Sequence, residues 1–244
     1  MAAPDRSCGG TGKYMHSLGL ELLMTTMKLY KMRSLEKLEF TLDIILNERL
    51  HCAPFTDLND PLEGVYLSAS APYFSRQLLG KYGATSVSPC DASELHEHER
   101  FNKICSLTKS FNDIRIWSHY GDGHRGIAIE IDFGGYENDT YPVRYLDELK
   151  QYSNTFLGAP PANEVLSQKT KHWLHEDEYR VMQPDDYYYV INRISAIYLG
   201  SRVSDERKAL LNKLVPNKIP IYFTRINKST LAVEPGDLMQ RSKQ

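Results

Sequence analysis

The chain of 244 residues has few cysteines, and none of them are close together in the sequence. Cys8, Cys52, Cys90 and Cys105 form no C-x-x-C motif, so the sequence gives neither a zinc signature nor a disulfide framework. Cys52 and Cys105 lie in apolar segments, where cysteine acts as a small buried hydrophobe. This usage fits a reducing compartment, and we expect the protein in the cytoplasm.

Long hydrophobic runs and targeting signals are also missing. No apolar run approaches the ~20 residues that a membrane-spanning helix needs, so we expect no membrane partner. The N-terminal segment lacks an A-x-A cleavage pattern and is interrupted by His16 and Glu21, which argues against a signal peptide. Residues 1–26 are either a loosely attached leader or a helix from Met15 to Thr26 that packs on the core.

The net charge and the short motifs argue against several kinds of binding site. The net charge is −2 at pH 7, so nucleic-acid binding would need a local basic patch. The sequence contains neither a P-loop nor G-x-G-x-x-G, which argues against a Walker or Rossmann nucleotide site. The run from His96 to Glu99 lacks the H-E-x-x-H spacing, and His172 and His175 have no third ligand in a matching context. We therefore expect no metal.

The most regular stretch that is present runs from Asn102 to Phe133 and predicts a strand, a short helix and a second strand. The second strand alternates between a branched apolar face and a small or acidic face. Such a pattern, with a partly buried second face, predicts a position near the centre of a sheet. Asp113 or Asn112 is expected to cap the helix, with Ile114, Trp117 and Tyr120 facing the core.

The remaining periodic segments alternate between short strands and single helices. The predicted helices cover 34–47, 163–173 and the segment that Ser204 caps, and a further helix is expected to begin at Asp60. The predicted strands lie around 28–32, 50–53, 141–146, 175–183, 187–200 and in a C-terminal pair. Residues 80–100 are expected to form an exposed insertion. We therefore predict an α+β fold for 27–244, a single domain with mostly antiparallel split sheets and flanking helices.

Two carboxylates and an arginine follow at alternate positions in Glu176, Glu178 and Arg180. If this segment enters a strand, the three side chains share one face. One carboxylate can then orient a sugar hydroxyl while the other stabilises positive charge on a reacting anomeric carbon. The arginine would keep at least one of them ionised. The alternative is a surface ion-pair strip, which contributes little to stability.

Several motifs occur in order along the chain: LYKMRS, LNDPLEG, ICSLTKS, WSHYGDGHRGIAIEID, VRY and W-x-x-E-x-E-Y-R. With these motifs, the chain from about Leu29 to Gly200 resembles the bacterial family called domain of unknown function 2971. That family in turn resembles the ADP-ribosyltransferase superfamily, in which a basic residue on the first strand and an acidic residue on a late strand share one site. The resemblance implies an ADP-ribosyltransferase-like fold and NAD as the substrate.

The resemblance also implies roles for individual residues. Lys31 or Arg33 would occupy the NAD-contact position of the first strand, and Glu176 or Glu178 the position of the catalytic glutamate. The cofactor-binding candidates, which come from the first strand, the short helix and the late strand, are Lys31, Arg33, Tyr30, Trp117, His119, Tyr120 and Arg180.

Four of these candidates have an expected contact with NAD. Arg33 or Arg180 would hold the pyrophosphate, and Tyr30 or Trp117 would stack on the nicotinamide ring. The turn-rich segment with Asn59, Asp60 and Glu63 would gate the pocket.

Three functions stay open. The first is an NAD-dependent ADP-ribosyltransferase-like protein, for example a toxin or phage-defence effector that modifies protein or nucleic acid. The second is a catalytically inactive relative that binds a nucleotide or a protein, such as an antitoxin or sensor. It is favoured because the first strand lacks the histidine and the second aromatic residue that such strands often carry. The third is a phosphoester hydrolase that uses His119 with Asp122 or His124, which we expect near Arg125 at one corner.

Overall fold

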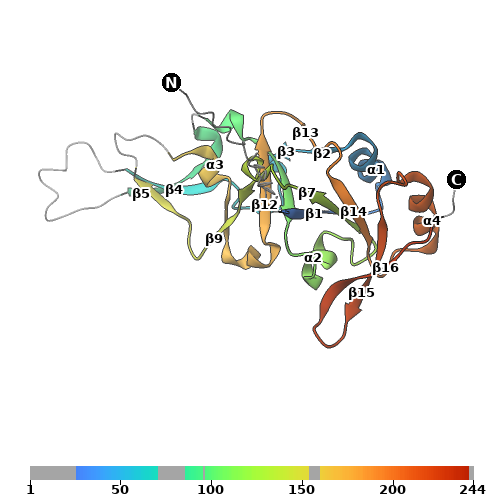
Figure 1. Cartoon of the computed structure of the whole chain (residues 1–244). Helices are drawn as coiled ribbons and strands as arrows, with labels where there is room; N and C mark the ends of the chain where they lie inside the picture. Colours follow the sequence, from blue (N-terminus) through green and yellow to red (C-terminus); the bar gives the residue numbers. More distant parts are fainter. Residues whose placement is uncertain (1–25, 71–85, 96, 154–159, 242–244) are drawn as a thin grey trace, which may run out of the picture.

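The computed structural model describes residues 26–70, 86–95, 97–153 and 160–241. It confirms an α+β protein whose strands pair mostly antiparallel (Figure 1). Four α-helices are described: α1 (Leu38–Asn47), α2 (Ile114–His119), α3 (Ala162–Val165) and α4 (Asp205–Leu214). None of the described helices has the length and apolar character that crossing a membrane requires.

The main sheet has nine strands in the order β16-β15-β14-β7-β1-β6-β12-β8, with β3 also paired to β6. Their bounds are β1 (Lys28–Arg33), β3 (Ala53–Pro54), β6 (Lys103–Thr108), β7 (Ile127–Asp132), β8 (Tyr141–Pro142), β12 (Glu178–Gln183), β14 (Ile194–Leu199), β15 (Ile221–Asn227) and β16 (Ala232–Leu238). Only β14 and β15 are parallel within this sheet.

Smaller sheets flank it. They are formed by β10 (Gln151–Ser153), β4 (Val65–Ser70) and β5 (Ser86–Asp91), by β11 (Gln168–Thr170) and β9 (Arg144–Leu146), and by β13 (Tyr187–Tyr189) and β2 (Arg49–His51). In Figure 1 the β4–β5 pair extends away from the main sheet on one side, and the β15–β16 hairpin projects on the other.

The alternating pattern of β7 explains its central position between β1 and β14. Ile127, Ile129 and Ile131 pack on one face with α1 and α4, while Ala128 faces α2 on the other. The two faces are covered by different helices, so both are buried, as the sequence predicts. Glu130 on the second face is therefore also buried, at 3% exposure.

The main sheet is nearly divided between β1 and β6. These two strands pair only at Tyr30 and Thr108, whereas β1 pairs with β7 along its whole length. At the other end of β6, β3 takes over as the neighbour through Ala53 and Ile104. The edge of β6 from Cys105 to Leu107 therefore faces a gap in the sheet, bordered by β1 and β3.

Some local predictions were wrong. The helix predicted for 34–47 begins at Leu38, because Ser34 caps only a turn through Glu36. The predicted helix 163–173 is divided into α3, β11 and a 3₁₀ helix η5 (Lys171–Glu176), since β11 pairs with the distant β9. A turn and no helix follows Asp60. Residues 1–25, 71–85 and 96 lie outside the described part, and with them most of the predicted leader. Most of the predicted exposed insertion 80–100 is described, and it is not simply exposed: β5 pairs with β4, and Ala92 and Leu95 are buried in the core.

Candidate functional site

A cavity of about 500 Å³ lies where β1 and β6 separate. Its walls come from β1, from β6 and from α1, and Leu58 and Asn59 of the segment before β4 also line it. Tyr30, Thr108 and Glu178 are neighbours across β1, β6 and β12. Arg33 lies three residues further along β1, which is ~10 Å in an extended strand. The lining of the cavity therefore extends along β1 from Tyr30 to Arg33.

The β1 side of the cavity is basic. The Lys31 ammonium donates a hydrogen bond to the Ser106 carbonyl at 2.9 Å and so satisfies the free edge of β6. The guanidinium of Arg33 has no hydrogen bond or ion pair with any described residue, and its Nε is buried without a partner. Burial lowers the pKa of Arg33, but an arginine keeps its charge at neutral pH. An unpaired guanidinium in a cavity is suited to bind an anion.

The opposite side is acidic, and the local backbone explains how the two glutamates come together. Glu176 ends η5, and Asp177 has a left-handed φ of 41°, which turns the chain into β12. The Thr108 hydroxyl donates to the Glu176 carbonyl at 2.5 Å and fixes this turn to β6. Lys169 of β11 then bridges the two carboxylates, 2.7 Å from Glu176 and 2.7 Å from Glu178.

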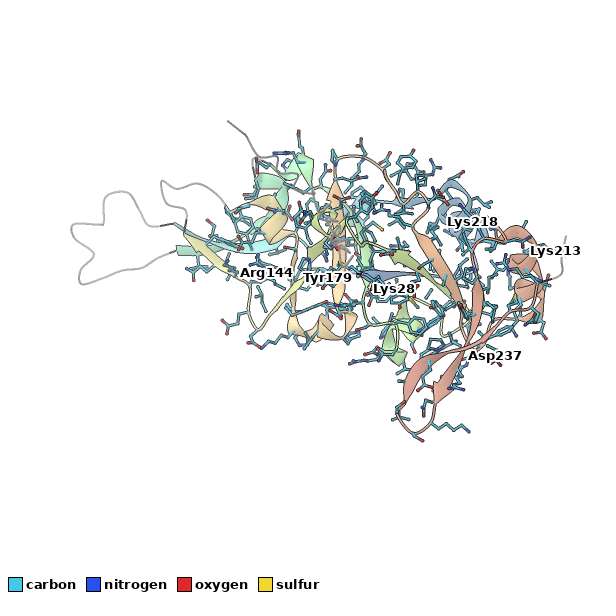
Figure 2. The ribbon with its side chains drawn as sticks, viewed as in Figure 1. Lys28, Arg144, Tyr179, Lys213, Lys218 and Asp237 are labelled. Carbon is cyan, nitrogen blue, oxygen red and sulfur yellow. The ribbon has the colours of Figure 1, made fainter. Side chains whose placement is uncertain are left out.

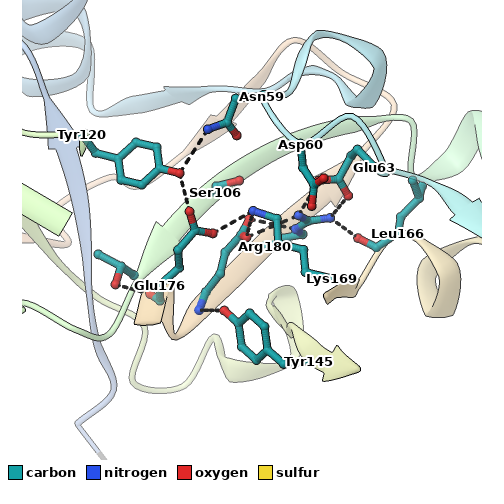
Figure 3. Close-up of polar contacts among 12 residues, drawn as sticks. Asn59, Asp60, Glu63, Ser106, Tyr120, Tyr145, Leu166, Lys169, Glu176 and Arg180 are labelled. Atoms are coloured by element: carbon teal, nitrogen blue, oxygen red, sulfur yellow. Dashed lines mark hydrogen bonds and ion pairs between the residues drawn. The ribbon is translucent and has the colours of Figure 1, made fainter. Parts of the chain in front are cut away.

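A fully buried arginine, Arg180, binds Glu178 and lies beside Glu63 (Figure 3). Its Nε donates to Glu178 at 2.8 Å, and its two terminal nitrogens bind Glu63 at 2.5 and 2.8 Å. It also donates to the Leu166 carbonyl at 2.5 Å. All of these hydrogen-bond partners of Arg180 are groups of the protein itself. Arg180 therefore ties β12 to the segment that carries Glu63.

The Tyr120 hydroxyl reaches the other side of the acidic pair. It donates to the free oxygen of Glu176 and accepts a hydrogen bond from the Asn59 amide at 3.2 Å (Figure 3). Burial and the neighbouring carboxylate raise the pKa of Tyr120, so the hydroxyl stays protonated and acts as the donor.

Burial and neighbouring charges shift the pKa values of the acidic cluster in opposite directions. Burial raises the pKa of Glu178, but Arg180 and Lys169 outweigh it and hold the pKa at about 2. Burial lowers the pKa of Lys169, and the two glutamates raise it above its usual value. Burial raises the pKa of Glu63 more than Arg180 lowers it, so the pKa of Glu63 stays above its usual value. Glu178, Lys169 and Arg180 are thus charged at neutral pH.

The structure brings together most of the predicted site. Both glutamates and four of the cofactor-binding candidates line the cavity, namely Glu176, Glu178, Tyr30, Lys31, Arg33 and Tyr120. Asn59 also lines it, whereas Asp60 accepts from the Leu62 amide in a turn and Glu63 binds Arg180.

Three candidates are corrected. Arg180 is buried and saturated by protein groups, so it cannot hold a pyrophosphate. Trp117 is fully buried, donates to the Phe111 carbonyl and does not line the cavity, so it cannot stack on a ligand there. His119 is exposed outside the cavity, and its ring lies beside Tyr120 and His175.

The predicted histidine corner has a different arrangement. His124 is buried and stacks on Trp117 at 6.1 Å between ring centroids, while Arg125 pairs with Asp122. Neither histidine of the proposed hydrolase therefore faces the cavity. Among the described residues, no group of three or more His, Cys, Asp and Glu side chains is placed to hold a metal ion.

The sequence alone did not identify two residues of the site. Lys169 was predicted on a helix, where its alignment with the glutamates was not visible. Tyr145 accepts from the Glu178 amide at 2.8 Å; it is the last residue of the VRY motif, but the sequence assigned no role to it. Comparisons of the chain with protein-family models, with curated proteins and with solved structures found no match.

Proposed function

We propose that the protein binds NAD in the cavity between β1 and β6 and transfers its ADP-ribosyl group to an acceptor on protein or nucleic acid. One observation carries this proposal: the sheet separates at a single strand pair, with two cations on β1 and two carboxylates across the same cavity. The division of the sheet also supports an ADP-ribosyltransferase-like fold. A volume of about 500 Å³ lies within the ~300–1,000 Å³ of small-molecule sites.

The basic side fits the pyrophosphate of NAD. Arg33 has donors without protein partners and can form two parallel hydrogen bonds to phosphate oxygens. Lys31 already donates to Ser106, and an ammonium has further protons to donate towards the cavity. Both cations come from one strand, so β1 sets the distance between the pyrophosphate and the acidic end.

The acidic side fits the reacting ribose. In the reaction, the bond between the ribose C1′ and the nicotinamide nitrogen breaks, and nicotinamide leaves with the bonding electron pair. An oxygen or nitrogen of the acceptor then forms the new bond to C1′ and loses its proton. Positive charge grows on the ribose as the first bond breaks, and a nearby carboxylate stabilises it. Tyr30 lies beside Thr108 at this end and lines the cavity, while its ring packs on Phe111 at 5.0 Å and its hydroxyl donates to Glu130 at 3.1 Å.

A second candidate is binding without turnover. Lys169 and Arg180 neutralise much of the negative charge of the glutamate pair. A neutralised carboxylate stabilises a developing cation less well. This arrangement favours an NAD-binding protein that senses or sequesters the nucleotide.

The test measures NAD binding by isothermal titration and nicotinamide release by chromatography. We expect the wild type to bind and to release nicotinamide. Arg33→Met should weaken binding roughly 10–150-fold, the equivalent of one hydrogen bond to a charged group. The matched control is Lys213→Met on α4, which Figure 2 shows far from Lys28 on β1. Binding without nicotinamide release selects the second candidate, and absence of binding refutes both.

A further inference from the structure

The two cavity glutamates are held in chemically different ways. Both oxygens of Glu178 accept from cations: Oε1 from the Arg180 Nε at 2.8 Å, and Oε2 from Lys169 at 2.7 Å and Arg180 at 3.3 Å. Taking one of these oxygens for a ligand would leave a buried cation without its partner. That exchange is costly, because the lost contact is charge-assisted and lies in the interior.

Glu176 has only one oxygen on a cation. Its Oε2 accepts from Lys169 at 2.7 Å, and its Oε1 accepts from the neutral Tyr120 hydroxyl. A ligand hydroxyl can join Tyr120 at Oε1 without uncovering a buried charge. A carboxylate oxygen has two lone pairs, so it can accept from both hydroxyls while Tyr120 holds it in place.

Tyr120 is itself held from the segment between β3 and β4. Asn59 donates to the Tyr120 hydroxyl, and four residues later Glu63 binds Arg180. The polar contacts therefore form a closed ring from Asn59 through Tyr120, Glu176, Lys169, Glu178 and Arg180 to Glu63 (Figure 3). The Asn59 contact lies at the cavity, whereas the Glu63 contact is buried behind it. The ring of polar contacts thus has one side at the cavity, where a ligand can reach it, and one side that is buried.

We infer that Glu176 is the carboxylate that contacts a ribose hydroxyl of the ligand, and that Tyr120 and Asn59 are its positioning residues. Glu178 is the counter-ion of Lys169 and Arg180 and fixes the ring from behind. The assignment rests on the proposed function and deepens it, since it names which member of the glutamate pair faces the sugar.

The chain contains a matched control for this cluster. Glu164 accepts from Lys150 at 2.5 Å and from the Tyr152 hydroxyl at 3.1 Å, as Glu176 accepts from a lysine and a tyrosine; Glu164 also pairs with Arg144 at 3.5 Å and is more exposed. None of Glu164, Lys150 and Tyr152 lines the cavity. Glu164→Gln and Tyr152→Phe therefore remove the same kinds of contact at a distance from the ligand.

The experiment measures the Kd for NAD and for ADP-ribose, together with the melting temperature of the free protein. Glu176→Gln and Tyr120→Phe should raise both Kd values at least ~10-fold, while Glu164→Gln and Tyr152→Phe should leave both Kd values unchanged. Glu178→Gln should lower the melting temperature more than Glu176→Gln does, since it leaves two buried cations undercompensated.

A double-mutant cycle separates positioning from structure. Asn59→Ala should weaken binding in the wild type and should add no further loss to Tyr120→Phe, because the hydroxyl through which it acts is gone. Additive losses would overturn the positioning role. Unchanged binding by Glu176→Gln, in a protein whose wild type binds NAD, would overturn the assignment alone. A wild type that binds neither NAD nor ADP-ribose would refute the proposed function and the assignment together.

Discussion

Replacing Arg180 by methionine perturbs the most deeply buried charge of the site. The change removes the only cation bound to Glu63 among the described residues, while Glu178 keeps Lys169. Breaking a buried ion pair by removing one partner costs ~3–5 kcal/mol. For a chain of this length, that corresponds to a fall in melting temperature of roughly 6–20 °C.

The pH dependence of this loss identifies its cause. Without Arg180, Glu63 escapes the cost of a buried charge by protonation, which from an ordinary pKa of 4.5 costs about 3.4 kcal/mol at pH 7 and about 0.7 kcal/mol at pH 5. The folded variant then binds more protons than its unfolded state, so its stability relative to the wild type falls as pH rises. The pKa of Glu63 is already raised in the wild type, so the deficit should be smaller at pH 5 than at pH 7 by at most ~2.7 kcal/mol.

The assay is urea unfolding at both pH values, followed by tryptophan fluorescence, with Trp117 buried in the core. Arg225→Met is the matched control, because its partner Glu234 lies at the surface and Arg225 is 72% exposed; it should change stability little. A deficit below ~1 kcal/mol for Arg180→Met, or one that is equal at both pH values, would refute the reasoning.

Two further predictions concern the same region. The pKa of Glu178 is lowered to about 2, so its contribution to stability is present above its unfolded value near 4.5 and is lost as pH falls towards 2; acid titration of the free energy of unfolding should show this loss in the wild type and a smaller one in Glu178→Gln. A Cβ on Gly126 would lie 2.2 Å from the Arg33 carbonyl, so Gly126→Ala should destabilise the protein by ~1–3 kcal/mol in thermal melts and weaken anion binding. Gly236→Ala, at 3.2 Å from Phe223, should cost clearly less, and equal costs would contradict this interpretation.

Local patterns predicted the parts of the fold that local chemistry determines. The alternation of Ile127, Ile129 and Ile131 predicted both the strand β7 and its central position. Small residues on its second face allow a helix to cover that face as well. Asp113 accepts from the Arg115 amide and caps α2 as predicted, yet Ile114 is 39% exposed and does not join the core. Helix starts are encoded within a few residues, but which side chains become buried depends on tertiary packing.

Non-local pairing explains what the sequence could not provide. β11 exists because Gln168 pairs with Arg144, so a segment with helical periodicity became a strand that carries Lys169 to the glutamates. Arg180 was expected at a ligand because alternation places it with Glu178, but the segment with Glu63 covers that face of β12. Periodicity assigns a side chain to a face and does not say what covers that face.

The cavity between β1 and β6 as the NAD site is tested most directly by a crystal structure of the protein soaked with NAD. We expect density for the dinucleotide in this cavity, with the pyrophosphate against Arg33 and the nicotinamide ribose beside Glu176. Density elsewhere on the molecule would contradict the proposed site. A dinucleotide bound in the reverse direction, with no carboxylate at its nicotinamide ribose, would contradict it too.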